Sequence, residues 1–153
     1  EDFAQYHPEG TLGRRLLLRA RDLMRQGDAL PRVYADESFA RLLMEMTAKQ
    51  LGLTLVLERD GRLRGTFTDG DLRRVFERVE DPRQLDAGAA HTHSRRPSAA
   101  PRVLVSTITP DRPAVDCLRI MRESCITALV VVDESGQPVG VLRLIDLVGA
   151  GLG

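Results

Sequence analysis

The chain repeats its own residue pattern at a fixed offset of 75 residues, and this repeat limits the folds that the sequence can adopt. No gap is needed from Ser38 to Leu72. The positions that match are apolar, glycine or acidic: Leu43 with Leu118, Met46 with Met121, Val56 with Val131, Gly61 with Gly136, Gly65 with Gly140, Asp71 with Asp146 and Leu72 with Leu147. A long unit that occurs twice predicts two copies of one α/β unit facing each other, with a ligand cleft between them, because a solenoid needs about three or more short repeats.

The composition limits the class of protein and its partners. The chain has 153 residues and is 42% apolar, which predicts one globular unit with a shared core. Its 22 basic and 22 acidic residues cancel, so we expect neither a nucleic acid nor a membrane as partner. No apolar run reaches the roughly 18 residues that cross a bilayer, and no signal segment is visible. These features predict a soluble cytoplasmic protein, and the start at Glu1 predicts a fragment of a longer chain.

The two cysteines are predicted to be structural. Cys117 lies on the apolar face of an expected helix, and Cys125 immediately precedes an expected strand. Both fit small buried hydrophobic residues in a reducing compartment, so no disulfide is expected.

Hydrophobic spacing predicts the order β-α-β-β-α in each copy of the repeat. A helix capped by Thr11 and ending near Met24 precedes the first copy. The first copy is predicted to contain an extended segment 30–34, a helix capped by Asp36 and ending near Gln50, strands 53–57 and 63–67, and a helix 69–78.

The second copy is predicted to contain an extended segment 103–108, a helix 113–124, strands 128–132 and 138–142, and a helix from Leu144. Residues 81–102 are rich in Pro, Ala, Ser and Gly, which is typical of a linker. The chain is therefore divided into a leading segment 1–24, a first unit 25–80, a linker 81–102 and a second unit 103–153.

In the first copy, the junction between the strand 63–67 and the helix 69–78 contains residues that could bind a ligand. Thr68 and Asp71 lie three residues apart at the start of this helix. A hydroxyl and a carboxylate at a helix N-terminus can hold a phosphate and a ribose diol. The same spacing is that of a capping box, in which both side chains only satisfy the first helical turn. The first copy alone leaves both interpretations open.

The second copy changes the balance between these interpretations. It keeps the acid as Asp146 but has Arg143 in the place of the threonine. An arginine side chain has no acceptor for a helix N–H. An acid that is kept without its capping partner favours a ligand role, with Arg143 as a clamp for a phosphate or carboxylate.

These junctions, together with the doubled unit, resemble a cystathionine β-synthase (CBS) domain pair over residues 24–150. The resemblance implies an α/β (α+β) fold, in which two β-α-β-β-α units are related by pseudo-two-fold symmetry. It also implies that such units bind adenine nucleotides or related ligands through the acid. The ligand-binding residues that follow from it are Thr68, Asp71, Arg143 and Asp146.

A second resemblance lies in three stretches, 3–18, 65–76 and 140–151. They are similar to bacterial arabinose 5-phosphate isomerases, in which a His-Pro-Gly-Gly segment joins a sugar isomerase (SIS) domain to a CBS pair. The resemblance implies a parent enzyme that interconverts ribulose 5-phosphate and arabinose 5-phosphate for synthesis of the lipopolysaccharide sugar Kdo. It implies an active-site role for His7 within that enzyme, although Glu9 replaces the first family glycine. The fragment lacks the SIS domain, so we expect it to be inactive alone.

The remaining histidines do not predict a metal site. His91 and His93 lie two residues apart, but no cysteine or acid cluster nearby completes the three or four ligands that zinc needs. They lie in the stretch 89–93, which stands where the family has a Val-Met-Thr motif.

The function predicted from the sequence is a regulatory module with no required cofactor, which binds an effector such as AMP, ATP or CMP-Kdo. The alternative is a structural module that only holds SIS domains in an oligomer. An independent enzyme is excluded, because the sequence has no nucleophile–base motif, metal set or glycine-rich phosphate loop. The resemblance to CBS pairs, which commonly bury helical faces against a second pair, implies a homo-oligomer. The last helix of each copy would supply the apolar positions Leu72, Val75, Phe76, Leu147 and Val148.

Overall fold

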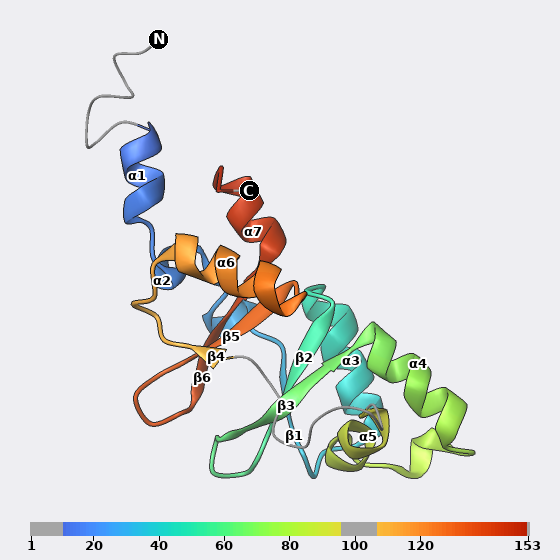
Figure 1. Cartoon of the computed structure of the whole chain (residues 1–153). Helices are drawn as coiled ribbons and strands as arrows, with labels where there is room; N and C mark the ends of the chain where they lie inside the picture. The colour runs from blue at the N-terminus through green and yellow to red at the C-terminus, as the bar shows by residue number, and fades with distance from the viewer. Residues whose placement is uncertain (1–10, 96–106, 153) are drawn as a thin grey trace. The chain divides into compact units, whose positions relative to one another are not determined.

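The computed structural model describes residues 11–95 and 107–152, which form two compact units. Among the described residues, the first-repeat unit comprises 28–95 with 136–138, and the second-repeat unit comprises 11–27, 107–135 and 139–152. Each unit is built on one three-stranded sheet with the strand order β1-β2-β3 or β4-β5-β6 (Figure 1). The described part of the leading segment, from Thr11 on, thus belongs to the same compact unit as the second copy of the repeat.

In the first-repeat unit, β1 (Arg32–Tyr34) pairs parallel with β2 (Leu53–Leu57), and β2 pairs antiparallel with β3 (Leu63–Thr68). The strand predicted at 53–57 is confirmed, and all five of its residues are buried. The helices α3 (Phe39–Lys49) and α4 (Asp69–Arg78) complete the unit. The buried core contains side chains from all of these elements, among them Val33, Phe39, Leu42, Val56, Phe67 and Val75.

The start of α3 differs from the prediction. Ser38, and not Asp36, is the N-cap, because its Oγ accepts a hydrogen bond from the N–H of Arg41 at 3.1 Å. Asp36 is instead paired with Arg59, whose Nε donates to Oδ2 at 2.8 Å. The helix ends at Gln50, which has a left-handed conformation with φ of 56°.

Part of the segment predicted as a linker is folded. It contains the short 3-10 helix η3 (Pro82–Gln84) and the helix α5 (Ala87–Ser94). Asp86 caps α5, because its Oδ1 accepts from the N–H of Ala89 at 2.8 Å. Ala87 and Ala90 are fully buried in the core of the first-repeat unit. These small side chains allow α5 to lie close to the sheet, but they give the sequence no apolar stripe.

In the second-repeat unit, β4 (Thr107–Ile108) pairs parallel with β5 (Ala128–Val132), and β6 (Pro138–Arg143) lies next to β5. The helices α6 (Ala114–Ser124) and α7 (Leu144–Gly149) follow the predicted positions. The bounds of α6, β5 and β6 are those of α3, β2 and β3 shifted by the repeat offset. The predicted extended residues 103–106 lie outside the described part of the chain.

The leading helix predicted at 11–24 is broken into α1 (Thr11–Leu17) and α2 (Ala20–Leu23). The break lies at Arg19, which is extended with φ of −120° and ψ of 166°. Here the backbone bonds to the loop before α6 instead of to its own helix. The N–H of Ala114 donates to the carbonyl of Leu18 at 2.8 Å, and the N–H of Ala20 donates to that of Arg112 at 2.9 Å.

The two cysteines differ in environment. Cys117 is fully buried in the core of the second-repeat unit, as predicted. Cys125 is exposed, contrary to the prediction, because it occupies the left-handed position that ends α6, with φ of 55°. It corresponds in the repeat to Gln50, which ends α3 in the same conformation.

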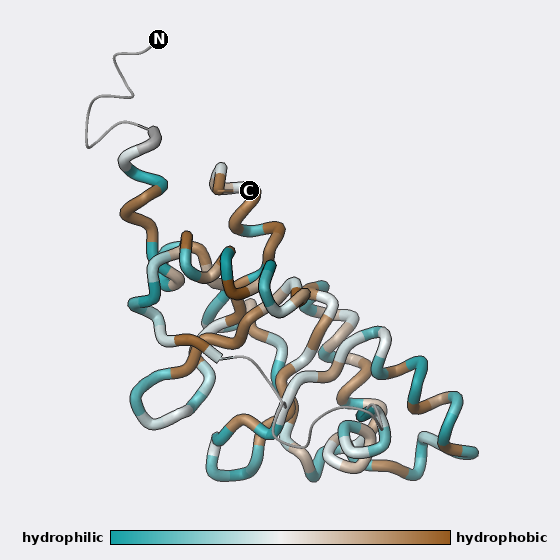
Figure 2. The backbone as a smooth tube through the Cα atoms, viewed as in Figure 1, coloured by the Kyte–Doolittle hydropathy of each residue, from teal (hydrophilic) through white to brown (hydrophobic). Residues whose placement is uncertain are grey.

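Hydrophobic residues concentrate on the strands, whereas α4 is largely hydrophilic (Figure 2). Two of the five positions predicted for self-association, Val75 and Leu147, are fully buried within their own units and so cannot form an outer surface. Leu72 packs partly against the core, whereas Phe76 and Val148 are 56% and 52% exposed. Within the described residues, no helix has the length and apolar character needed to span a membrane.

Candidate functional site

The acid of the second copy is held by arginines. Asp146 Oδ2 accepts from the backbone N–H and the Nε of Arg143, both at 3.2 Å. Its Oδ1 accepts from Nη2 of Arg143 and from Nη2 of Arg25, again at 3.2 Å each. The carboxylate makes half of a capping box, since the arginine side chain has nothing to accept the return bond. Two arginines thus contact the acid that lacks its capping threonine in the second copy.

Arg25 reaches this site because the segment after α2 crosses β6. The backbone of Arg25 pairs with that of Val141 through two hydrogen bonds of 2.8 and 3.0 Å. Gly140 makes the crossing possible, because a Cβ at this position would approach Sδ of Met24 to 2.5 Å. The repeated glycine thus serves the close approach of another segment.

A cavity of about 610 Å³ adjoins this carboxylate. This volume lies in the usual range for small-molecule sites. Two guanidinium groups, two carboxylates and apolar side chains share its wall, which is formed by Asp22, Leu23, Met24, Arg25, Arg143, Ile145, Asp146, Gly149 and Ala150. All of these residues belong to the second-repeat unit.

The charge of Asp146 is fixed by its neighbours. Burial by itself raises the pKa of this carboxyl, but the hydrogen bonds from Arg143 and Arg25 outweigh burial and hold the pKa below its usual value. The site therefore presents a carboxylate at neutral pH, as an acceptor for hydroxyl donors, beside two guanidinium groups that suit phosphate or carboxylate.

In the first-repeat unit, the predicted capping box is present. Oγ1 of Thr68 accepts from the N–H of Asp71 at 3.2 Å, and Oδ2 of Asp71 accepts from the N–H and Oγ1 of Thr68 at 2.8 and 3.0 Å. Nη2 of Arg74 pairs with the other carboxylate oxygen. Thr68 and Asp71 thus meet in space, and each is already occupied by capping bonds.

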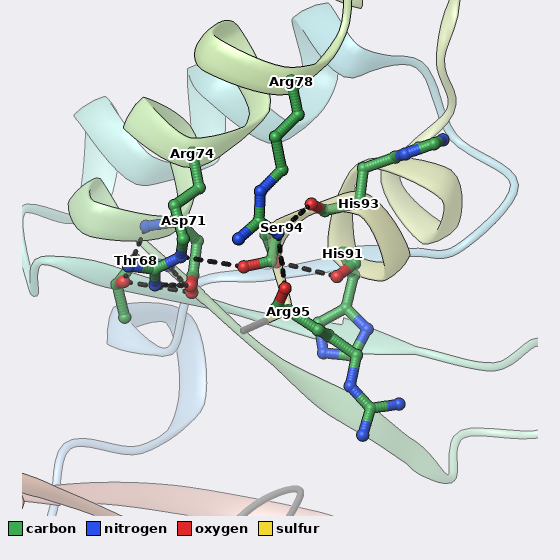
Figure 3. A network of polar contacts seen from close by, with 8 residues as sticks. All are labelled: Thr68, Asp71, Arg74, Arg78, His91, His93, Ser94 and Arg95. Carbon is green, nitrogen blue, oxygen red and sulfur yellow. Dashed lines mark hydrogen bonds and ion pairs between the residues drawn. The ribbon is translucent and has the colours of Figure 1, made fainter. Parts of the chain in front are cut away.

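Two arginines of α4 also hold the end of α5 (Figure 3). Nε of Arg74 donates to the carbonyl of Ser94 at 2.8 Å, and Nη1 of Arg78 donates to the carbonyl of His93 at 2.8 Å and to that of Arg95. The last carbonyls of an α-helix point out of its end without intrahelical donors, and the arginines supply donors at this helix end. The spacing of Arg74 from Asp71 was a signal available in the sequence, whereas the contact with α5 was not.

The histidines lie in unlike surroundings. His91 is half-buried with its imidazole across Gly65, where a Cβ would overlap the ring. Burial and the charge of Arg64 lower its pKa, so the ring is neutral at pH 7. His93 is exposed, and His7 lies outside the described residues. In residues 11–95 and 107–152, no group of three or more His, Cys, Asp and Glu side chains is placed to hold a metal ion.

Comparison with known protein sequences gives two findings. A family model of the CBS domain matches residues 20–78 and 101–153. The arabinose 5-phosphate isomerase KdsD of Pseudomonas aeruginosa is 45% identical over 152 residues, which are 99% of this chain and 44% of that protein. KdsD of Escherichia coli K12 is 40% identical, with 99% and 43% covered. The chain spans less than half the length of these curated relatives.

Solved structures share the fold. The CBS domain protein PAE2072 of Pyrobaculum aerophilum, complexed with AMP, superposes with a TM-score of 0.66 at 21% identity and covers 84% of this chain and 89% of that one. CBSX2 in complex with AMP gives a TM-score of 0.67 at 21% identity, with 88% and 96% covered. The likeness extends to the CBS domain of a bacterial CNNM/CorC family Mg²⁺ transporter in complex with ATP, with a TM-score of 0.68 at 13% identity and 92% and 91% covered.

Proposed function

Because this chain belongs to the CBS domain family, we propose that it is the regulatory module of an arabinose 5-phosphate isomerase. In this proposal, the second-repeat unit binds a nucleotide or nucleotide sugar at Asp146. The observation that carries the proposal is the cavity in which Asp146 is kept charged between Arg25 and Arg143.

Each group has a role in the proposed complex. The Asp146 carboxylate accepts hydrogen bonds from the two hydroxyls of a ribose, and Arg143 or Arg25 turns from the carboxylate to a phosphate. The exchange is favourable because a bidentate guanidinium–phosphate pair replaces the ion pair that it breaks. Thr68 and Asp71 form the corresponding site of the first-repeat unit, where the ligand competes with capping bonds.

An adenine nucleotide is the leading ligand class, because two related folds were solved with AMP and one with ATP. CMP-Kdo is the second candidate, since a product of the Kdo pathway is a logical feedback signal for an early enzyme. Neither ligand acts as a cofactor in this proposal, because the module itself carries no reaction.

The isomerase activity belongs to the parent protein. The relatives are more than twice as long as this chain, and the resemblance assigns their catalytic domain to the part that this chain lacks. His7 contributes to that active site only in the full-length enzyme. We expect the fragment to give no turnover of ribulose 5-phosphate above a buffer blank.

Thermal unfolding with AMP, ATP and CMP-Kdo tests the ligand proposal. A ligand at about 100 times its dissociation constant stabilises the folded state by about 2.7 kcal/mol. For a chain of this size, the melting temperature then rises by roughly 5 to 10 °C. Asp146→Asn, which keeps the shape but not the charge, is expected to remove most of this shift at the second-repeat site.

Asp116→Asn is the matched control, because Asp116 lies on α6 of the same unit and forms an ion pair with the half-exposed Arg119. It is expected to leave the shift unchanged. If no ligand raises the melting temperature of the unchanged chain, or if Asp146→Asn responds as fully as Asp116→Asn, the binding proposal is wrong.

The alternative function is an oligomerisation module without a ligand. It is favoured by the exposed apolar side chains of α7, where Ile145 is 65% and Val148 is 52% exposed. Sedimentation of the chain and of Val148→Glu separates the two functions. A dimer at tens of micromolar that dissociates with Val148→Glu, together with no response to any nucleotide, would establish the alternative.

A further inference from the structure

The two copies of the repeat place different side chains over the same glycine. Gly65 and Gly140 correspond in the repeat and lie in β3 and β6. Met24 crosses Gly140 in the second-repeat unit, and His91 crosses Gly65 in the first-repeat unit. A Cβ at either glycine would overlap the side chain that crosses it.

Met24 indicates the role of the side chain that lies over the repeated glycine. It lines the cavity in which Asp146 lies. Since Asp71 corresponds to Asp146, the repeat gives His91 the same place relative to Asp71 that Met24 has relative to Asp146. The second-repeat site therefore has an apolar thioether where the first-repeat site has an ionisable imidazole.

The charged groups around His91 come from two elements and two connections. They are Arg64 of β3, Asp71 of α4, Arg95 after α5, and Glu58 between β2 and β3. Nη2 of Arg64 donates to Oγ1 of Thr92 at 3.0 Å, which holds this guanidinium beside the helix that carries His91. Burial and the arginines together outweigh the two acids, so the pKa of His91 is lowered.

We propose that His91 contacts the ligand of the first-repeat unit and takes up a proton when a phosphate-bearing ligand binds beside Asp71. This inference rests on the proposed nucleotide-binding function. A phosphate adds negative charge close to an imidazole that is otherwise surrounded by arginines, and this charge favours the imidazolium. The imidazolium in turn donates a charge-assisted hydrogen bond to the phosphate.

Binding and protonation are therefore linked. Affinity for the phosphate-bearing ligand rises as the pH falls, because the bound state holds a proton that the free state does not. A difference of about half to one pKa unit between the two states corresponds to a 3- to 10-fold gain in affinity between pH 7.5 and 5.5. The second-repeat site, with Met24, has no group at this position that titrates in this interval.

Calorimetric titration with AMP at pH 7.5 and 5.5 tests the inference. The Asp146→Asn background restricts the measurement to the first-repeat site. Because a phosphate monoester itself titrates near pH 6, the informative quantity is the difference between this background and the same background with His91→Met. We expect His91→Met to retain binding and to lose the 3- to 10-fold gain.

Two controls match this experiment. His93→Gln changes an exposed histidine of the same helix and is expected to keep the pH response. Adenosine, which lacks the phosphate, is expected to bind without a difference between the background and His91→Met. Equal pH responses of the background and His91→Met toward AMP would overturn the inference.

Proton NMR of the His91 ring gives a measurement that does not require the His91→Met substitution. Its pKa is expected to rise when AMP is added to the Asp146→Asn chain. If AMP binds and leaves this pKa unchanged, the His91 inference fails while nucleotide binding stands. If AMP binds the unchanged chain but not Asp146→Asn, the His91 inference fails alone. If none of AMP, ATP and CMP-Kdo binds the unchanged chain, the proposed function fails, and the His91 inference fails with it.

Discussion

The two copies of the repeat have the same arrangement of strands and helices, but different residues surround the corresponding acids Asp71 and Asp146. β2 and β5, β3 and β6, and α3 and α6 keep the same bounds after the repeat offset is applied. The acids differ in their partners. Asp71 is bonded by Thr68 and Arg74, which lie three residues away on either side, whereas Asp146 is bonded by Arg143 and by the distant Arg25. The apolar and glycine positions therefore specify the fold, and a few polar changes specify the chemistry.

The largest expected effect concerns the two cysteines of the second-repeat unit. Cys125 is exposed at the end of α6, whereas Cys117 is buried within it, and burial raises the pKa of Cys117 to about 11. At pH 8, about one thousandth of the Cys117 thiol is ionised, and its side chain is also shielded. We expect Cys125 to react with a thiol reagent at least about 100-fold faster.

Mass spectrometry after timed alkylation checks this prediction. Cys125→Ser should leave almost no fast labelling, and denaturant should expose the second thiol. Equal labelling of both cysteines in the native chain would contradict the burial of Cys117 and the exposure of Cys125.

The second prediction concerns the corresponding glycines. Gly65→Ala and Gly140→Ala should each destabilise the fold by about 1 to 3 kcal/mol, because the added Cβ overlaps His91 or Met24. Gly140→Ala is expected to cost more, since the backbone carbonyl of Arg25 lies 3.0 Å from the new Cβ and cannot rotate away. Urea denaturation measures both differences.

Gly149→Ala is the matched control, because a Cβ at this position of α7 meets no atom within 4 Å. It should be neutral or stabilise the helix by up to about 1 kcal/mol. A Gly140→Ala chain as stable as Gly149→Ala would disprove the close crossing of β6.

The third prediction compares how much Asp71 and Asp146 contribute to the stability of the fold without ligand. Asp71→Ala should lower the free energy of unfolding by about 0.5 to 2 kcal/mol, because it removes the return bond of a capping box. Asp146→Ala should cost a similar amount, about 1 to 2 kcal/mol, since it leaves Arg25 and Arg143 without the carboxylate that both contact. Urea denaturation of both variants without ligand measures the two losses in the free energy of unfolding.

The salt dependence of the two losses in unfolding free energy distinguishes an ion-pair contribution from a helix-capping contribution. The loss at Asp146 should shrink in high salt, because part of it is an ion pair with the half-exposed Arg25. The loss at Asp71 should change less, since backbone capping bonds form a larger share of it. A negligible cost of Asp146→Ala at any salt concentration would contradict the observed arginine contacts.

The smallest expected effect is on the pH dependence of stability. The pKa of His91 is lowered in the folded state by burial and by Arg64, so the unfolded chain takes up a proton first as the pH falls. Stability from this group is full above the unfolded pKa of about 6.5 and is lost as the pH falls toward the folded pKa. His91→Met, which copies Met24, should flatten the unfolding curve between pH 7 and 5, and His93→Gln should not.

The sequence predicted the parts of this fold that depend on local apolar patterns. β2 and β5 were placed to the residue because each is a short, mainly apolar run followed by a turn that contains glycine. The bounds of α4 were also correct, because Thr68 and Asp71 form a capping box that marks its start. The cap of α3 was misplaced, since Asp36 and Ser38 are both good caps and only the structure shows that Asp36 pairs with Arg59.

The parts that the sequence did not predict depend on distant contacts. α5 was taken for a linker because it buries only small residues such as Ala87 and Ala90. Arg25 was not assigned to the site of Asp146, because the two residues are separated by 121 positions and meet only where the leading segment crosses β6. For the same reason, the sequence pattern did not show that His91 and Met24 occupy corresponding places.

The crossing of β6 by Arg25 has a consequence for the order in which the protein folds during synthesis. The sheet and the α-helices of the first-repeat unit all lie between residues 32 and 94, so these elements can form while the ribosome is still adding the later residues. The segment that contains Arg19 and Arg25 is made earlier, but its backbone partners, Pro113 and Val141, emerge only near the end. The segment that contains Arg19 and Arg25 can therefore fold only after Val141 has been made. In a nascent chain stalled before Val141, this segment should be cut by protease while the sheet and helices of the first-repeat unit are already protected.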